Sequence, residues 1–275
     1  MKALVELVRA PAALTVPGDA VAGAAASGWP FGRRTLALTS ASVCIYWAGM
    51  ALNDYADRHL DAMERPERPI PSGRVKPGTA LGVATGLTAG GLGIAAAAGG
   101  KHALRVAVPL AATVWAYDFV LKETVFGPAA MAAARALDVL LGAGGARAAM
   151  PAALTVGAHT YAVTTLSRSE VDGAKPALPA ATLAATAGVR VAAGRVGPLA
   201  SALLGTYAVT TGRAQYDAVR DPAAPQIRRA VGAGIHGMIP LQAGLIARTG
   251  AWRSALAVAA AFPIARALSR KVSPT

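Results

Sequence analysis

The chain has 275 residues, of which 54% are hydrophobic and 15% charged, and its mean hydropathy is +0.44. Its apolar residues come in long blocks, which is typical of an integral membrane protein and disfavours a soluble, Ala-rich bundle. The net charge of +13 is spread over the segments between these blocks. It therefore indicates contact with anionic lipid or substrate and argues against a nucleic-acid partner.

Ten apolar blocks follow one another, each close to the length needed to cross a bilayer. The turns within the last two pairs are so short that either pair could contain a broken helix. We predict an all-α, polytopic bundle of nine or ten transmembrane helices, folded as a single domain over residues 1–275. The blocks cover approximately 12–29, 35–53, 78–99, 102–121, 128–145, 149–166, 177–193, 195–212, 231–248 and 251–268.

The connections between blocks predict the orientation in the membrane. If the spans alternate from a cytoplasmic N-terminus, the inner side receives about twice as many Lys and Arg residues as the outer side, which is the usual bias. The inner side then also receives the three long or strongly charged loops, 54–77, 167–176 and 213–230. We expect a cell-membrane protein whose chemistry faces the cytoplasm.

Three acids stand at the end of the second block, in the stretch Asn53–Asp61. Asp57 follows Asp54 by three residues and precedes Asp61 by four, so on a helix the three carboxylates share one face. Such close like charges repel and need a cation between them. A hard ion such as Mg²⁺ suits this all-oxygen set. The alternative is a solvated, charged helix end.

The loop that follows reads Arg65-Pro-Glu-Arg-Pro-Ile-Pro-Ser-Gly-Arg74. Its prolines and glycine end the helix and fix an extended turn, which we expect to bring Arg65, Arg68 and Arg74 near the acids. Arginines beside metal-binding carboxylates suit a diphosphate. Positive charge that only sets topology is the alternative.

These motifs resemble those of a known family. NDYADRHLD followed by RPERPIPSG is similar to the first aspartate-rich motif and trailing Arg-Pro segment of the UbiA superfamily of intramembrane prenyltransferases. YDFVLK at 117–122 resembles its Tyr-x-x-x-Leu-Lys segment, and RALDVLLG at 135–142 resembles its following helix. The resemblance implies a helical bundle around a central cavity open to lipid. It also implies Mg²⁺-dependent transfer of a prenyl group from its diphosphate to a small-molecule or lipid acceptor.

The resemblance also implies roles for single residues. Asn53, Asp57 and Asp61 would bind the metal and diphosphate, with Asp54 assisting as a further metal ligand. The cationic side chains would bind phosphate oxygens and take up charge as the carbon–oxygen bond breaks. They are Arg65, Arg68 and Lys122, and Asp57, Asp61 and Lys122 are expected to be catalytic. Asp138 is a fourth catalytic candidate on a separate ground, because it is a polar residue inside a predicted span.

The second acid-bearing loop departs from the family pattern. Family members carry another aspartate-rich motif after the sixth span, whereas the segment here keeps only Glu170 and Asp172. Residues two apart do not share a helix face, so they can hold a metal together only if the backbone is irregular, as Gly173 permits. We take both as candidate metal ligands, and the flanking Arg168 and Lys175 as candidate diphosphate-binding residues.

Polar residues also fall inside predicted spans, where they usually face a partner or a cavity. Arg135 and Asp138 lie on one helix face and could neutralise each other. Alternatively, Asp138 could face the cavity and orient or deprotonate an acceptor. His159 lies inside a span with Tyr161 nearby. Outside the spans, Asp217 and Asp221 are surrounded by arginines, and we expect a surface ion-pair network there.

Two other functions remain open from the sequence. In one, a polyprenyl phosphate serves as acceptor for a sugar phosphate within the same fold. In the other, the reduced second motif indicates a non-catalytic membrane protein that binds isoprenoids.

Overall fold

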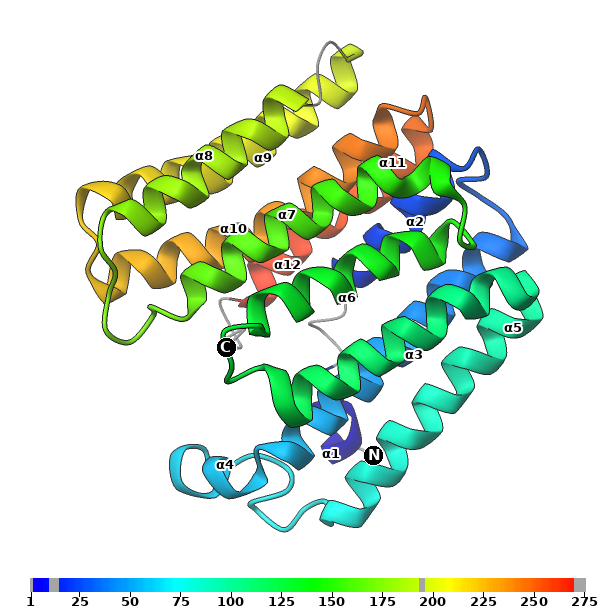
Figure 1. Ribbon diagram of the computed structural model, residues 1–275, viewed down its shortest axis with the longest axis vertical. Coiled ribbons are helices and arrows are strands. Elements are labelled where there is room, and N and C mark those ends of the chain that lie inside the picture. Colours follow the sequence, from blue (N-terminus) through cyan, green and yellow to red (C-terminus); the bar gives the residue numbers. More distant parts are fainter. Residues whose placement is uncertain (1, 10–14, 193–195, 270–275) are drawn as a thin grey trace.

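The computed structural model describes residues 2–9, 15–192 and 196–269. Every regular element in these ranges is helical, which confirms the all-α prediction (Figure 1). A π-helical turn (Tyr117–Leu121) continues α5, and a 3-10 turn (Arg147–Ala149) precedes α7. The α-helices are α1 (Lys2–Leu7), α2 (Val16–Ala26), α3 (Arg33–Ala56), α4 (Arg58–Glu64), α5 (Pro77–Ala116), α6 (Gly127–Gly142), α7 (Met150–Ser167), α8 (Ala177–Ala192), α9 (Pro198–Arg220), α10 (Ala224–Ala247), α11 (Trp252–Ala259) and α12 (Ala261–Ser269).

Helix α5 consists of two arms that correspond to two predicted blocks. Gly100 has φ 57° and ψ −148°, a conformation that L side chains rarely adopt, and the chain folds back there (Figure 1). The arms pack antiparallel, and the Trp115 indole donates a hydrogen bond to the Thr88 hydroxyl at 3.1 Å. The sequence thus predicted the break between 78–99 and 102–121 correctly.

The last predicted block is broken. It forms α11 and α12, which meet at Ala260, in place of one continuous span over 251–268. By length and composition, three of the described helical stretches could cross a membrane: Arg33–Ala56, Pro77–Leu121 with its two arms, and Ala224–Ala247.

Small residues let the helices approach closely, as expected for packing inside a bilayer. A Cβ on Gly142 of α6 would lie 2.0 Å from the Ala20 carbonyl oxygen of α2. One on Gly23 of α2 would lie 1.8 Å from the Val139 carbonyl oxygen. Even a methyl group at either glycine would force α2 and α6 apart.

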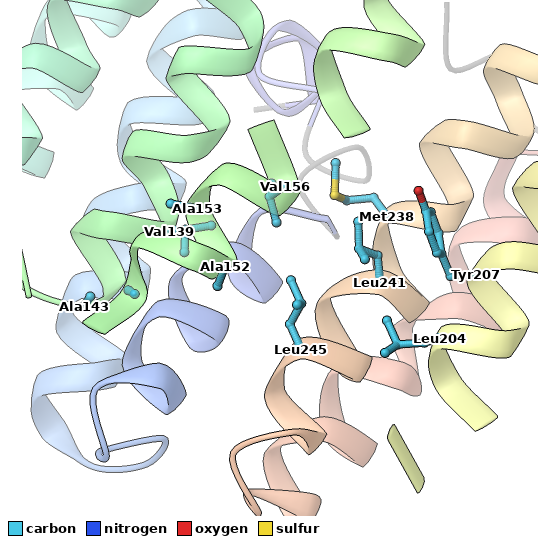
Figure 2. Packing of buried hydrophobic residues seen from close by; sticks show 11 residues of the cluster. Val139, Ala143, Ala152, Ala153, Val156, Leu204, Tyr207, Met238, Leu241 and Leu245 are labelled. Carbon is cyan, nitrogen blue, oxygen red and sulfur yellow. The ribbon is translucent and has the colours of Figure 1, made fainter. Parts of the chain in front are cut away.

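The largest apolar cluster joins α6, α7, α9 and α10 (Figure 2). Leu204, Tyr207 and Leu241 are fully buried there, beside Val139 and Val156 of the neighbouring helices. A second cluster joins α3, both arms of α5 and α6. These two clusters fix the bundle and leave the connections at its ends to carry other functions.

The four connections that follow α3, the second arm of α5, α7 and α9 gather at one end of the bundle, at the left of Figure 1. The connections between α2 and α3, between the arms of α5, between α6 and α7 and between α10 and α11 lie at the other end. Both acid-bearing segments predicted from the sequence therefore lie at the same end.

Candidate active site

The acid stretch crosses a junction between two helices. Helix α3 ends at Ala56 and α4 begins at Arg58, with Asp57 at φ −85° and ψ 2° between them. The backbone N–H of Asp57 still donates to the Asn53 carbonyl at 2.9 Å, and that of Asp61 donates to the Asp57 carbonyl at 2.8 Å. The helical register thus continues across the junction, and Asn53, Asp57 and Asp61 stay one turn apart.

The acids of this junction and the polar side chains that contact them form one group, which we call the acid cluster. Its first half surrounds Asn53 and Asp57. Lys122 forms an ion pair with Asp57. The Asn53 amide group donates to Asp57 Oδ2 at 3.1 Å and to Asp118 Oδ1 at 3.3 Å. Asp118, only 5% exposed, was not among the predicted site residues. Its position inside an apolar block was the signal that could have identified it.

The π-helical turn aims two of these side chains. The Lys122 N–H donates to the Tyr117 carbonyl at 3.0 Å, five residues back, so the backbone here is wider than an α-helix. Such turns are frequent at functional sites. Here the turn directs Asp118 toward Asn53 and Lys122 toward Asp57.

The second half of the cluster surrounds Asp54 and Asp61. Arg68 Nη1 lies 2.6 Å from Asp61 Oδ2 and 3.5 Å from Asp54 Oδ1. Arg9, just after α1, contacts the same Asp54 oxygen at 3.0 Å and Asn53 Oδ1 at 3.4 Å. Sequence reasoning did not identify Arg9, because no spacing rule connects residue 9 with residue 54.

The other two arginines of the proline-rich loop behave differently. Arg65 closes α4 through a backbone bond to the Asp61 carbonyl at 2.8 Å, and its side chain is half-buried. Arg74, expected near the acids, instead pairs with Glu6 of α1 and donates to the Glu67 carbonyl. This pairing keeps the pKa of the Glu6 carboxyl below its usual value.

The second acid-bearing loop has an irregular backbone at Gly173, where φ is 78°. Asp172 and Lys175 are exposed, whereas Glu170 is half-buried, and burial raises the pKa of its carboxyl. Its carbonyl accepts a bond from Arg228 at 2.8 Å, and Arg168 donates to the Thr124 carbonyl. In the described ranges, no hydrogen bond or ion pair joins the side chains of this loop to the acid cluster.

The buried polar groups of the bundle are paired differently from the prediction. Arg135 Nε lies 2.8 Å from Asp19 Oδ2 of α2, so its partner is Asp19 and not Asp138. Asp138 is 6% exposed and lies beside Ser42 of α3. Ser42 is three turns, or about 16 Å, along α3 from Asn53. The structure therefore places Asp138 away from the acid cluster.

The polar residues inside α7 and the acids at the end of α9 differ in their contacts. His159 is a satisfied buried residue, 3.0 Å from both the Tyr207 hydroxyl and the Gly234 carbonyl, while Tyr161 is exposed. The ion-pair network around Asp217 and Asp221 is absent from the described part of the chain. Instead, Asp221 accepts bonds from the start of α10.

The oxygen atoms of the acid cluster could bind Mg²⁺ only together with water and substrate phosphate. In the ranges that the structure describes, no three His, Cys, Asp or Glu side chains converge as a metal cage. Mg²⁺ commonly needs only one or two carboxylates, however, with waters and substrate phosphates filling its remaining positions. Asp57 and Asp61, each now neutralised by one cationic side chain, offer such carboxylates. The amide oxygen of Asn53 is a further donor.

The chain is similar to several known proteins. Curated relatives include the digeranylgeranylglyceryl phosphate synthases of Methanopyrus kandleri, 39% identical over 129 residues (45% of each chain), and of Natronomonas pharaonis, 40% identical over 82 residues (30% of each chain). The aligned stretches thus span less than half the length of these relatives.

Solved structures share the fold along nearly the whole chain. A structure of digeranylgeranylglyceryl phosphate synthase matches with a TM-score of 0.69 at 16% identity, covering 90% of this chain and 98% of that one. A UbiA homologue from Archaeoglobus fulgidus bound to DMAPP and Mg²⁺ matches with a TM-score of 0.64 at 19% identity, covering 94% and 99%. The model of the UbiA prenyltransferase family matches residues 13–219, well over half of the sequence. The chain therefore belongs to the UbiA prenyltransferase family.

Proposed function

We propose that this protein transfers a prenyl group from a prenyl diphosphate to a small-molecule or lipid acceptor within the membrane, with Mg²⁺ as cofactor. The observation that supports this function best is the acid–cation cluster at the α3–α4 junction. There Lys122 pairs with Asp57 and Arg68 pairs with Asp61, at the end of an apolar bundle. A metal–diphosphate ligand needs this combination of carboxylate and cationic side chains in one place.

In this proposal the cluster exchanges partners when substrate binds. Asn53, Asp57 and Asp61 would hold the metal, which would neutralise diphosphate charge and stabilise the leaving group. Lys122 and Arg68, released from their carboxylates, would turn to phosphate oxygens, with Arg65 beside them. Hydrogen-bond donors that are already positioned beside the leaving diphosphate stabilise the negative charge that develops on it, and so lower the barrier to breaking the carbon–oxygen bond.

The transfer itself is balanced without a redox partner. The bond between prenyl C1 and the diphosphate oxygen breaks, and its electron pair leaves with the diphosphate. A lone pair of the acceptor forms the new bond to C1, and the acceptor's proton passes to the released diphosphate or to water. Apolar helix walls exclude water, which would otherwise capture the allylic cation. Asp138 lies beside Ser42, about 16 Å along α3 from Asn53, so we assign it no part in taking up the acceptor's proton.

The second acid-bearing loop is a secondary candidate in the same reaction. Glu170 and Asp172 would hold a second metal ion, with Arg168 and Lys175 near the phosphates, only if the loop moved toward the acid cluster. The half-buried carboxyl of Glu170 is the better placed of the two acids. We propose that this end of the bundle faces the cytoplasm, because the charged loops collect there.

Incubation with substrates tests the proposal. Purified protein would receive Mg²⁺, prenyl diphosphates of graded length and a glyceryl phosphate lipid, the acceptor class that the names of the relatives indicate. We expect a product heavier by one prenyl chain, one inorganic diphosphate released per product, and loss of both with EDTA.

Two outcomes would contradict it. A product in which sugar phosphate has been added to a polyprenyl phosphate would indicate the sugar-phosphate transferase. Binding of prenyl diphosphate without release of diphosphate, for any chain length and with a small-molecule extract as acceptor, would indicate a non-catalytic isoprenoid-binding protein.

A further inference from the structure

Asp54 differs from the other acids of the cluster in its partners. It is 3% exposed, and a single carboxylate oxygen, Oδ1, receives both Arg9 at 3.0 Å and Arg68 at 3.5 Å. Asp57 and Asp61 each contact one cationic side chain. A metal bound at Asp54 Oδ1 would have to displace two guanidinium groups.

The chain holds Arg9 at this point through α1. Leu7 is fully buried against α3 and the proline-rich loop, in a cluster with Leu52 and Ile70. Arg74 of the same loop pairs with Glu6. Arg9 itself has φ 44°, the left-handed region that non-glycine residues seldom adopt. Such strain persists only where the surroundings impose it, and it is concentrated at functional sites.

Two guanidinium groups repel each other unless a negative charge lies between them. Asp54 supplies that charge and so keeps Arg9 and Arg68 side by side at the edge of the acid cluster. Paired arginine forks match the several oxygens of a diphosphate, which can accept bonds from both. We propose that Asp54 is a positioning residue that holds Arg9 and Arg68 as a two-arginine clamp for the diphosphate, and that it is not a metal ligand.

This inference rests on the proposed function only in taking diphosphate as the ligand, and binding measurements can test it without turnover. The Asp54→Asn variant keeps the shape of the side chain and removes its charge, and Asp57→Asn is the matched control. Two affinities would be measured on detergent-solubilised protein: that for Mn²⁺ by electron paramagnetic resonance, and that for inorganic diphosphate with Mg²⁺ by calorimetry. Thermal unfolding would confirm that each variant is folded.

For Asp54→Asn we expect an unchanged Mn²⁺ affinity and diphosphate binding weaker by about ten- to a hundredfold, the loss of one or two charge-assisted bonds. Asp57→Asn should lose Mn²⁺ binding. Arg9→Gln, on a side chain that is partly exposed, should reproduce Asp54→Asn. The double variant Asp54→Asn with Arg9→Gln should bind diphosphate no more weakly than either of these single variants. The effects of two substitutions in residues that act together do not add. Arg33→Gln, at the exposed start of α3 and at the other end of the bundle, should bind like wild type.

Loss of Mn²⁺ affinity in Asp54→Asn, to the level of Asp57→Asn, would overturn the inference and make Asp54 a metal ligand. Unchanged diphosphate binding in Asp54→Asn or in Arg9→Gln would also overturn it, and the proposed prenyl transfer would stand. Wild-type protein that binds no diphosphate in the presence of Mg²⁺ would instead refute the proposed function, and the clamp with it.

Discussion

The two acid-bearing segments at the same end of the bundle differ in what supports them. In the α3–α4 segment the acids stand one turn apart on continuous helical hydrogen bonds, and each contacts a cationic side chain from another part of the chain. In the α7–α8 loop the acids stand on irregular backbone around Gly173, and Asp172 is exposed. Acids that stand on continuous helix and already contact cationic side chains form a site, whereas the two acids of the α7–α8 loop remain separate charges.

Removal of a carboxylate from the α3–α4 segment should have the largest effect. Asp57→Ala and Asp61→Ala each remove a proposed metal ligand and leave Lys122 or Arg68 without its partner. We expect turnover of a prenyl diphosphate to fall by at least about a hundredfold. The assay is diphosphate release at saturating Mg²⁺, with the exposed Asp217→Ala as control. Wild-type rates in either variant would contradict the assignment of the metal site.

Substitution of Lys122 should have the second-largest effect on activity. Lys122→Met keeps the aliphatic stem and removes the charge that would stabilise the leaving group. We expect kcat to fall by about a hundredfold, with a smaller change in KM, since this charge acts mainly in the transition state. Lys122→Arg should recover part of the rate. A variant that changes only KM would show that Lys122 binds ground-state substrate alone.

The α7–α8 loop should contribute less. Glu170→Gln is expected to lower the rate by about tenfold or less, and Asp172→Asn by less than about twofold, in line with the smaller effects of exposed charges. Steady-state rates of both variants beside wild type measure the difference. If either variant lost as much activity as Asp57→Ala, the two segments would contribute equally to catalysis, and the difference between them described above would be wrong.

The effect of pH should be smaller still and should come from Glu170. Because burial raises the pKa of its carboxyl, Glu170 takes up a proton at a higher pH than an exposed glutamate and then cannot bind a metal ion. The ratio of wild-type to Glu170→Gln activity should therefore approach one as pH falls from 7 to 5. A ratio that increases as pH falls would show that the protonated form is the active one.

The sequence predicted the parts of this molecule that local rules decide. Apolar blocks predicted the helices, including the fold-back near Gly100, and the three- and four-residue spacings predicted the stacked acids. Contacts between distant segments were missed or wrong. Nothing in the sequence indicated that Arg9 meets Asp54, that Arg74 turns to Glu6, or that Arg135 pairs with Asp19. These pairings depend on how α1 and α2 pack, which flat, Ala-rich helices do not reveal.

The central claim is that the α3–α4 segment binds metal and diphosphate and that the α7–α8 loop is secondary. Equilibrium binding of a non-reactive geranyl thiodiphosphate analogue, with and without Mg²⁺, tests it most directly. We predict that wild-type binding requires Mg²⁺, that it is lost in a variant with both Asp57→Asn and Asp61→Asn, and that it persists in Glu170→Gln. Tight binding by the double variant, or its loss in Glu170→Gln, would contradict the claim.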